Sequence, residues 1–269
     1  MKPKFTKLNS AKSSRSTKPK TTSWENVAGW YDGWVGKKGS HYHRKVALPT
    51  TLELLEPRPG ERILDLGAGS SVLAPHVARA GANYVGVEVS SSLVRSAKQH
   101  HGKAGEFICA DVRNLQKLPT IKEKSFDGAV FLLSLQDMDP LDEVVGAAGW
   151  ALKKGGRVVI FMVHPCFRVP RQSGWGYDAG RKLTYRRVDS YLRPLDVPMK
   201  DHIKGPGTTR SFHRPREHYV MSLSNAGLYI DALLELPDQP MNKGEQDNQD
   251  IPLFLALRAR KLGQTASSK

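Results

Sequence analysis

Short apolar runs alternate with segments of helical periodicity from Glu61 onward. Five of the apolar runs are candidate strands: RILDLG (62–67), YVGVEV (84–89), EFICAD (106–111), FDGAVFLLSL (126–135) and RVVIFMV (157–163). The segments between them have the length and the periodicity of helices. The pattern therefore predicts parallel βαβ units, with helices covering the sheet.

Three helices are expected between these strands, over 72–82, 91–101 and 140–156. The last of them ends in a Lys pair and a Gly pair, a frequent signal of a helix C-terminus. Residues 24–56 are expected to be helical and to precede the sheet. Near the other end, REHYVMSLSNAGL predicts a helix, and YIDALLEL and IPLFLALRAR predict two final strands.

The net charge of +15 lies in two segments of the chain. Residues 1–22 contribute +7 and residues 164–216 contribute +8, so the rest is neutral. Residues 1–22 are rich in Lys, Ser and Thr without apolar periodicity, and we expect a disordered basic tail. Residues 23–269 are expected to form one domain, in which 164–216 is a basic, aromatic insertion.

The sequence shows no clear membrane span, secretory signal or cysteine framework. No apolar run approaches the ~20 residues of a membrane span, and no apolar segment follows the first charges as in a secretory signal. The two cysteines, Cys109 and Cys166, are too few for a disulfide framework or a zinc site of their own. We expect a cytoplasmic protein with no metal site, and the sequence leaves its oligomeric state open.

Gly67 and Gly69, in DLGAGSS (65–71), stand between a predicted strand and a predicted helix. Glycines there let the backbone turn sharply and approach a ligand that a β-carbon would exclude. A dinucleotide-binding fingerprint would need a third glycine at position 72, where this chain has Val72. The loop is typical of a nucleotide site but does not favour a dinucleotide; by itself it could also be a plain tight turn.

Acidic residues mark the ends of the first three predicted strands. Asp65, Glu88 and Asp111 are spaced 23 residues apart, and the carboxyl ends of parallel strands meet at one edge of a sheet. A carboxylate such as Glu88 can accept hydrogen bonds from both hydroxyls of a ribose. Each acid could instead be a helix cap or a turn residue, but together they favour a nucleoside site.

With these residues, the chain resembles the class I S-adenosylmethionine-dependent methyltransferases. The resemblance covers roughly Trp24 to Arg260 and is carried by ILDLGAGSS, YVGVEVS, CADVRNL, FDGAVFLLSLQDM and LKKGGRVVIFMVHP in the family's order. It implies an α/β, Rossmann-like sheet of seven strands, mostly parallel with an antiparallel last strand, and helices on both faces. It also implies S-adenosyl-L-methionine as the cofactor.

The resemblance assigns a role to each matched position. Asp65, Gly67, Ala68 and Gly69 match the loop around the methionine part of the cofactor, although Ser71 stands where the family frequently has a glycine. Glu88 and Val89 match the ribose site, Asp111 and Val112 the adenine site, and Leu133 and Ser134 the end of the fourth strand, whose backbone often contacts the cofactor.

The segment WENVAGWYDGWVGKKGSHYHR looks like the amino-terminal helices of quinone-biosynthesis methyltransferases. Tyr31 is its candidate contact to the methionine carboxylate. The alternative is that Trp30, Tyr31 and Trp34 only pack this helix on the sheet.

The methyl acceptor is harder to predict, because methyl transfer needs positioning more than a base. His164 is the candidate catalytic base, or a histidine bonded at the pocket wall. Asp137 and Asp139 could orient the acceptor, or Asp139 could cap a helix. Cys166 in HPCF could be a nucleophile, but the acidic motif that accompanies one is missing, so a small buried residue is favoured.

The insertion 164–216 is the expected acceptor-binding region, because the fold that the resemblance implies keeps its substrate variation there; a mobile, cationic surface loop without a ligand is the alternative. The insertion mixes six aromatic residues with twelve cations. It suits a small aromatic or anionic metabolite held by arginines under a lid. The Arg-Pro and Tyr-containing segment SFHRPREHYVMSLSNAGL resembles the pocket closure of small-molecule methyltransferases and favours this acceptor. RNA bound by the tail and the insertion is the alternative, and a non-catalytic, cofactor-binding protein is a third.

Overall fold

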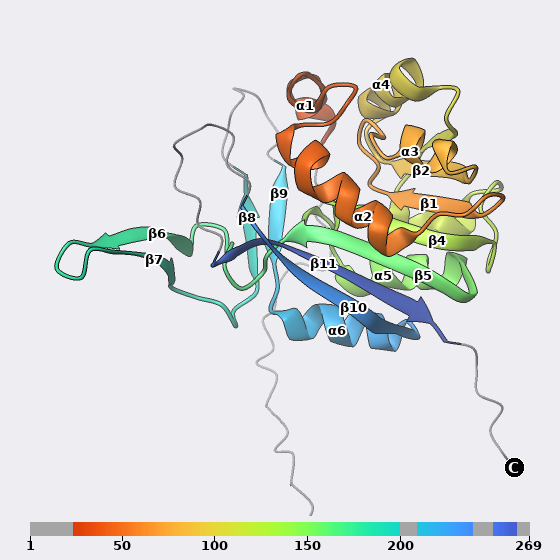
Figure 1. The fold of residues 1–269 in the computed structure, drawn as a ribbon. Coiled ribbons are helices and arrows are strands. Elements are labelled where there is room, and N and C mark those ends of the chain that lie inside the picture. The colour runs from red at the N-terminus through yellow and green to blue at the C-terminus, as the bar shows by residue number, and fades with distance from the viewer. Residues whose placement is uncertain (1–23, 200–208, 239–249, 263–269) are drawn as a thin grey trace, which may run out of the picture.

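The computed structural model describes residues 24–199, 209–238 and 250–262 of the chain. Its central element is a seven-stranded sheet with the strand order β10-β11-β5-β4-β1-β2-β3 (Figure 1). The strands are β1 (Arg62–Leu66), β2 (Asn83–Glu88), β3 (Glu106–Cys109), β4 (Phe126–Leu132), β5 (Leu152–Val163), β10 (Leu228–Pro237) and β11 (Pro252–Lys261).

Strands β1 to β5 are parallel, and β11 is antiparallel to both of its neighbours, β5 and β10. The predicted sheet, with an antiparallel last strand inserted beside the sixth, is confirmed. The middle strands are apolar on both faces because helices cover both sides: Ile63 and Leu64 of β1 are both fully buried but belong to opposite cores. This is the arrangement that near-continuous apolar runs predict.

Two layers of helices enclose the sheet. One core contains residues of α2, α3 and α4, and the other contains residues of η3, α5 and α6, so the helices lie above and below the sheet in Figure 1. The helical elements are η1 (Glu25–Val27), α1 (Ala28–Val35), the π-helix η2 (His43–Ala47), α2 (Leu48–Leu55), α3 (Ala74–Arg79), α4 (Ser91–His101), η3 (Val112–Lys117), η4 (Leu135–Asp137), α5 (Leu141–Ala151) and α6 (Arg216–Asn225).

The prediction that a helix continues to residue 156 was wrong. Helix α5 ends at Ala151, and β5 begins directly at Leu152, which pairs with Phe126 of β4. The Lys pair belongs to this strand rather than to a helix end, and Lys153 donates to the Asp127 carboxylate of β4 at 2.7 Å. The cross-strand ion pair gives the basic residues a partner that sequence signals for helix ends could not reveal.

The segment 24–56 is helical as expected, but it consists of two helices with a break between them. Helix α1 ends at Val35, and the next residue, Gly36, has a φ of 60°, a backbone conformation that favours glycine. The helix α2, extended at its start by η2, packs on β4, β5 and β11. Helix α1 instead contacts α4, which places it over the β2 side of the sheet.

The insertion 164–216 contains strands that the sequence did not predict. These are β6 (Ser173–Asp178), β7 (Leu183–Val188), β8 (Leu195–Pro198) and β9 (Arg210–His213). They form two antiparallel pairs, β6–β7 and β8–β9. Strand β9 contacts η4, whereas β6–β7 projects away from the main sheet (Figure 1). The predicted disordered tail, residues 1–22, lies outside the described residues.

No helix among residues 24–199, 209–238 and 250–262 is long and apolar enough to cross a membrane.

Candidate functional site

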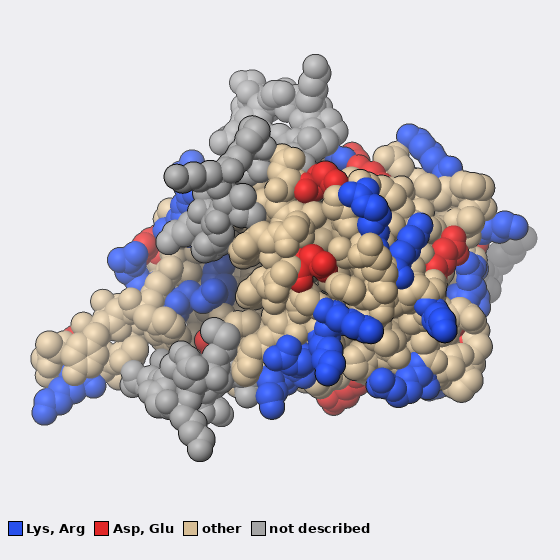
Figure 2. Space-filling model, turned by 90° about the horizontal axis from the view of Figure 1, so that it is seen from above, with Lys and Arg blue, Asp and Glu red and all other residues tan. Residues whose placement is uncertain are grey.

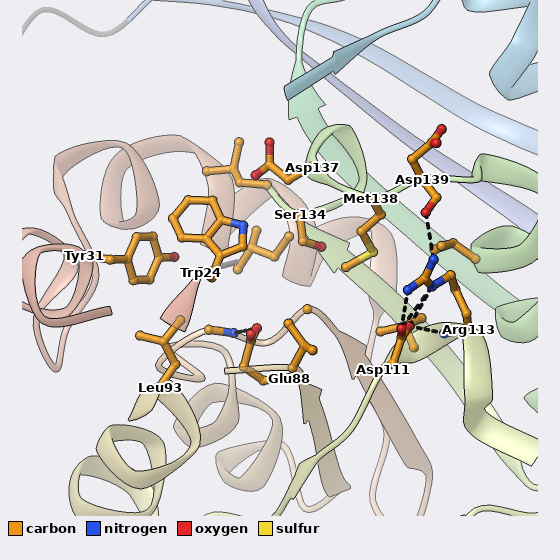
Figure 3. A pocket seen from close by; sticks show the side chains of 17 residues that line it. Trp24, Tyr31, Glu88, Leu93, Asp111, Arg113, Ser134, Asp137, Met138 and Asp139 are labelled. Carbon is orange, nitrogen blue, oxygen red and sulfur yellow. Dashed lines mark hydrogen bonds and ion pairs between the residues drawn. The ribbon is translucent and has the colours of Figure 1, made fainter. Parts of the chain in front are cut away.

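A pocket lies at the carboxyl ends of β1, β2 and β4 and beside the loop after β3. It encloses about 880 Å³ of empty space, its open mouth included. Figure 3 shows the side chains around it. The residues that line it are Trp24, Tyr31, Gly67, Gly69, Glu88, Val89, Leu93, Asp111, Val112, Arg113, Leu132, Leu133, Ser134, Asp137, Met138, Asp139 and Val144.

The glycine loop after β1 forms part of the wall and packs closely against its neighbours. Gly67 has φ of 71°, and a Cβ placed on it would lie 2.3 Å from Met138 Cε and 2.8 Å from Ser134 Cβ. Gly69 has φ of 54°, and its Cβ would lie 3.2 Å from Tyr31 Oη. Ser71 also has a positive φ of 59°, so the loop keeps a glycine-like backbone where the expected third glycine is missing.

Glu88 presents a buried carboxylate at the end of β2, 6% exposed. Its Oε2 accepts a hydrogen bond from the Gly69 amide at 3.0 Å, and its Oε1 accepts one from the Ser90 amide at 2.9 Å. Burial raises the pKa of Glu88, and these amide donors oppose the shift. Because each carboxylate oxygen has a second lone pair, the group can accept two more hydrogen bonds from a ligand.

Asp65 and Ala68 are the two predicted cofactor residues that do not line the pocket. The Asp65 carboxylate is 2% exposed and accepts a hydrogen bond from the Tyr84 hydroxyl at 2.7 Å. Burial raises its pKa to about 7; the Tyr84 hydrogen bond opposes this shift and the Glu88 carboxylate adds to it. Asp65 lies beneath the glycine loop, and its Oδ1 has no hydrogen-bond partner among the described residues.

Asp111 is both a pocket residue and a helix cap. Its Oδ1 accepts from the amide of Arg113 at 2.9 Å, and its carboxylate pairs with the guanidinium of the same residue (Figure 3). Burial disfavours the charged form, but the Arg113 hydrogen bonds outweigh it and lower the pKa of Asp111. Arg113 also donates to the backbone carbonyl of Asp139 at 3.2 Å. Arg113, which joins two walls of the pocket, was not among the residues predicted from the sequence.

Residues of the amino-terminal segment cover the pocket on the side of α4. The rings of Trp24 and Tyr31 meet edge to face, with centroids 5.3 Å apart. Glu25 fastens this segment to the start of α4: its carboxylate accepts from the hydroxyls of Ser90 and Ser92, both at 2.6 Å, and from the Ser92 amide at 3.1 Å. Hydrogen bonds from Ser90 and then Ser92 lower the pKa of Glu25 to about 2.

Trp30 and Trp34 are not part of this cover. Their rings stack on each other on the outer side of α1 and are 41% and 53% exposed. Tyr31, by contrast, lines the pocket. Its pKa is raised by burial and by the nearby carboxylates of Glu88 and Asp137, so its hydroxyl stays protonated and can donate a hydrogen bond.

Asp137 and Ser134 form the wall of the pocket across from Glu88 (Figure 3). Ser134 Oγ donates to the Leu66 carbonyl at 2.6 Å, which fixes the end of β4 against β1. Asp137 is 6% exposed, and burial raises its pKa well above the usual value although the Arg214 charge opposes this. A buried carboxyl with a raised pKa in a pocket is a candidate for exchanging a proton with a bound ligand.

Asp139 does not cap α5, so that interpretation was wrong. The residue before the helix is Pro140, whose side chain has no group that can accept a hydrogen bond. The Asp139 carboxylate instead accepts from Arg214 Nη2 at 2.8 Å, and the same nitrogen donates to the Met138 carbonyl at 2.7 Å. Arg214, 6% exposed, thus joins the segment after β9 to the pocket wall.

His164 is not among the residues that line the pocket. Its side chain is fully buried, with Nε2 2.8 Å from Glu235 Oε1, and its Nδ1 accepts from the Cys166 amide at 3.2 Å. Burial lowers the pKa of His164, and the Glu235 carboxylate opposes the shift. Both ring nitrogens already have partners, but these partners lie outside the lining of the pocket. Its role as a base stays a prediction.

The structure therefore brings together most of the candidate residues. Nine of them line one pocket: Tyr31, Gly67, Gly69, Glu88, Val89, Asp111, Val112, Leu133 and Ser134. Six further residues line the pocket but were not predicted, because apolar or charged side chains at such positions are equally typical of packing or of the surface. They are Trp24, Leu93, Arg113, Leu132, Met138 and Val144.

Comparison with known proteins agrees with this geometry. Residues 64–160 match a family described as "Methyltransferase domain", and they include the glycine loop, Glu88 and Asp111. A crystal structure of an S-adenosylmethionine-dependent methyltransferase from Mesorhizobium loti superposes with a TM-score of 0.65 at 25% identity, covering 79% of this chain and 96% of that one. Residues 64–160 thus form a methyltransferase domain, and the fold and the relatives together support a class I S-adenosylmethionine-dependent methyltransferase.

Curated relatives of this family member include ubiquinone biosynthesis O-methyltransferases. The protein of that name from Xanthomonas axonopodis pv. citri is 28% identical over 131 residues, which cover 49% of this chain and 54% of that protein. The one from Ralstonia nicotianae is 31% identical over 108 residues, which cover 40% and 45%. The chain spans about half the length of these curated relatives.

The pocket fits the cofactor of the family, S-adenosyl-L-methionine. Gly67 and Gly69 leave a cradle that a Cβ would fill, and Glu88 holds free acceptor positions at the end of β2. Leu93, Val112 and Val144 supply apolar surface for a purine ring. The carboxylates of Glu88 and Asp137 lie on two sides of the cavity (Figure 3) and suit a ligand that carries positive charge on sulfur and nitrogen.

Proposed function

We propose that the chain transfers a methyl group from S-adenosyl-L-methionine to a small acceptor that is aromatic, quinone-like or otherwise anionic. The observation that carries the proposal is the joint position of Glu88, the glycine cradle and Tyr31 around one covered pocket. When bound, the cofactor supplies an electrophilic methyl group on a sulfonium. The chain then has to hold donor and acceptor in line and to exclude water.

Each part of the pocket has a task in this proposal. Glu88 accepts hydrogen bonds from the ribose hydroxyls, and the backbone of Gly67 and Gly69 lies against the methionine part. Trp24 and Tyr31 cover the cavity and exclude water, which strengthens every electrostatic contact inside it. The family names of the curated relatives, which are O-methyltransferases, support a hydroxyl oxygen as the nucleophile.

Asp137 is our candidate for the group that takes the acceptor's proton. It lines the pocket and lies in a buried position that raises its pKa, and a base works best when its pKa lies near the working pH. His164 would have to give up its contact with Glu235 to serve in this way. Arg214, which bonds to Asp139 beside the pocket, is a nearby cation for an anionic acceptor.

The proposal is tested by incubating the chain with S-adenosylmethionine labelled in the methyl group and a cell extract, and then separating RNA, protein and small molecules. Label in the small-molecule fraction, lost in Glu88→Ala, is the expected result. Label in RNA would identify RNA as the acceptor instead. Cofactor binding without transfer to any fraction would support a non-catalytic, cofactor-binding protein.

A further inference from the structure

The β6–β7 ribbon, residues 173–188, serves neither the core nor the pocket. It is a two-stranded antiparallel sheet, and the pocket-lining residues, taken over the described part of the chain, all come from elsewhere. An isolated hairpin is marginally stable and gains little from exposing large apolar side chains. Yet Trp175, Tyr177 and Tyr185 of the ribbon are 46%, 63% and 43% exposed.

Strand register assigns these rings to faces. Trp175 lies opposite Arg186, and Tyr177 lies opposite Thr184, so these four residues share one face. Tyr185 lies opposite Gly176 on the other face, where a Cβ on the glycine would be 2.5 Å from the tyrosine ring. Trp175 and Tyr177, two residues apart on one strand, have ring attachments separated by roughly 6.6 Å, so each ring can take a planar partner of its own.

The net charge of the ribbon is positive. It carries Arg181, Lys182, Arg186 and Arg187 against the single carboxylate of Asp178. The Arg181 and Arg187 side chains are 81% and 61% exposed, and each pairs with one carboxylate, Asp178 at 3.8 Å and Asp189 at 3.0 Å. Figure 2 shows Lys and Arg at the end of the projection on the left.

The base of the ribbon is anchored. Arg186 donates to the Phe167 carbonyl at 2.7 Å and to Ser173 Oγ at 3.1 Å, and its guanidinium lies 5.1 Å from the centre of the Trp175 ring. Next to the Ser173–Val188 pair, the Asp189 amide donates to the Gln172 carbonyl at 2.8 Å, which continues the pairing of the two strands by one hydrogen bond. The aromatic face is therefore tied at its base to residues 167–173, the segment that leads into the ribbon.

We propose that the β6–β7 ribbon binds single-stranded nucleic acid, with bases stacked on Trp175 and Tyr177 and phosphates at Arg181, Lys182 and Arg187. Exposed rings interleaved with cations are the combination that binds single strands without sequence preference. The inference goes beyond the proposed function, because it concerns a surface outside the pocket and holds for any methyl acceptor.

Two other partners fit the ribbon less well. A second copy of the chain would bring a ribbon of the same positive charge against this one, and charged side chains along edge strands oppose edge-to-edge pairing. A membrane would require the apolar side chains on one face or at the tip. The tip is Ala179 to Lys182, where Arg181 is largely exposed, and the rings are divided between both faces.

The test measures binding of a fluorescent 12-nucleotide oligouridine to the full chain by anisotropy over a range of salt. The aromatic variant Trp175→Ala/Tyr177→Ala is expected to bind at least about tenfold more weakly with an unchanged salt slope. The charge variant Arg181→Ala/Lys182→Ala should also bind more weakly and lower the slope by roughly one. The controls Tyr229→Ala and Lys98→Ala/Lys103→Ala, exposed residues on β10 and near α4, should match the wild type.

Unchanged oligouridine affinity in the aromatic variant would overturn the proposal, whether or not the chain transfers methyl groups. A DNA strand of the same length serves as a second arm, and the same dependence there supports the proposal. Loss of binding to phosphatidylserine vesicles, or of self-association in sedimentation, without an effect on oligouridine would assign the ribbon to a membrane or to a second copy instead. An unchanged affinity for S-adenosylmethionine shows that the variants are folded.

Discussion

The hydroxyl of Tyr31 lies directly over Gly69, close enough that a β-carbon on the glycine would be 3.2 Å from the tyrosine oxygen. The cover of the pocket and its glycine loop are therefore fitted to each other. Sequence separates the two residues by a helix and a strand, and the fold brings them into contact around the space where the cofactor would lie.

Gly69→Ala should weaken the binding of S-adenosylmethionine at least about tenfold, because the new methyl group meets Tyr31 and a residue with a β-carbon is strained by about 1 kcal/mol at a φ of 54°. Calorimetric titration measures the affinity. Gly146→Ala in α5, where a Cβ would meet nothing within 4 Å, is the matched control. Equal affinities in the two variants would mean that the loop is not the cofactor cradle.

Glu25→Gln should speed the release of S-adenosylmethionine about three- to tenfold, because the variant loses a charge at the start of α4 and weakens four hydrogen bonds. Stopped-flow fluorescence of the nearby tryptophans can follow release, with Glu53→Gln on α2 as the control. Unchanged release would show that this contact does not hold the cover closed.

The contact between Glu25 and the start of α4 also makes the stability of the amino-terminal segment depend on pH, and the sign follows from the pKa of Glu25. The pKa of Glu25 is lowered to about 2 in the folded chain, so its stabilising contribution is present above the ordinary pKa near 4.5 and is lost as the pH falls toward 2. Resistance of the amino-terminal segment to protease should persist down to about pH 4 in the wild type and be weaker in Glu25→Gln above that pH, with the difference shrinking as the pH falls toward 2.

Much of the fold and part of the site follow from local patterns. Continuous apolar runs predict the buried parallel strands, and Gly67, Gly69 and Glu88 are recognisable because the backbone geometry and the chemistry of a nucleoside site require those residue types. The end of α5 was misjudged, because Lys153 is paired with Asp127 across the sheet, a long-range contact with no local signal.

The rest of the site depends on tertiary contacts that no short pattern encodes. Arg113 is a pocket residue because it bridges the Asp111 carboxylate and the Asp139 carbonyl from two loops. Strands β6 and β7 were missed because Trp175, Tyr177 and Tyr185 alternate with glycine and charged residues and neither strand has a buried face. His164 was a natural candidate from its position after β5, but Glu235 from β10 occupies its ring nitrogen.

Asp65 should make the stability of the protein fall as the pH rises. Its folded pKa of about 7 is above the ordinary value of 3.8, so its contribution to stability is fully present below pH 3.8 and is lost as the pH rises through 7. Asp65→Asn keeps the shape and removes the titration. Denaturant unfolding between pH 4 and 8 should show a smaller decline for the variant; an identical pH profile would contradict this assignment.

Asp137→Asn should lower kcat by about 10²-fold or more with little change in cofactor affinity, as expected for the loss of a general base. Because burial raises the pKa of Asp137, the wild-type rate should rise with pH as the carboxyl ionises, and this rise should be absent in the variant. His164→Ala is the companion measurement. A loss of similar size there, with a normal rate in Asp137→Asn, would make His164 the base.

The central claim is that the cavity between Glu88, the glycine loop and Tyr31 holds S-adenosylmethionine. Calorimetric titration of the wild type against Glu88→Ala tests it most directly, with Glu106→Ala at the exposed start of β3 as the control. We expect one binding site in the wild type and the control, and a loss of roughly 1–3 kcal/mol of binding free energy in Glu88→Ala. The same affinity in all three proteins would place the cofactor elsewhere.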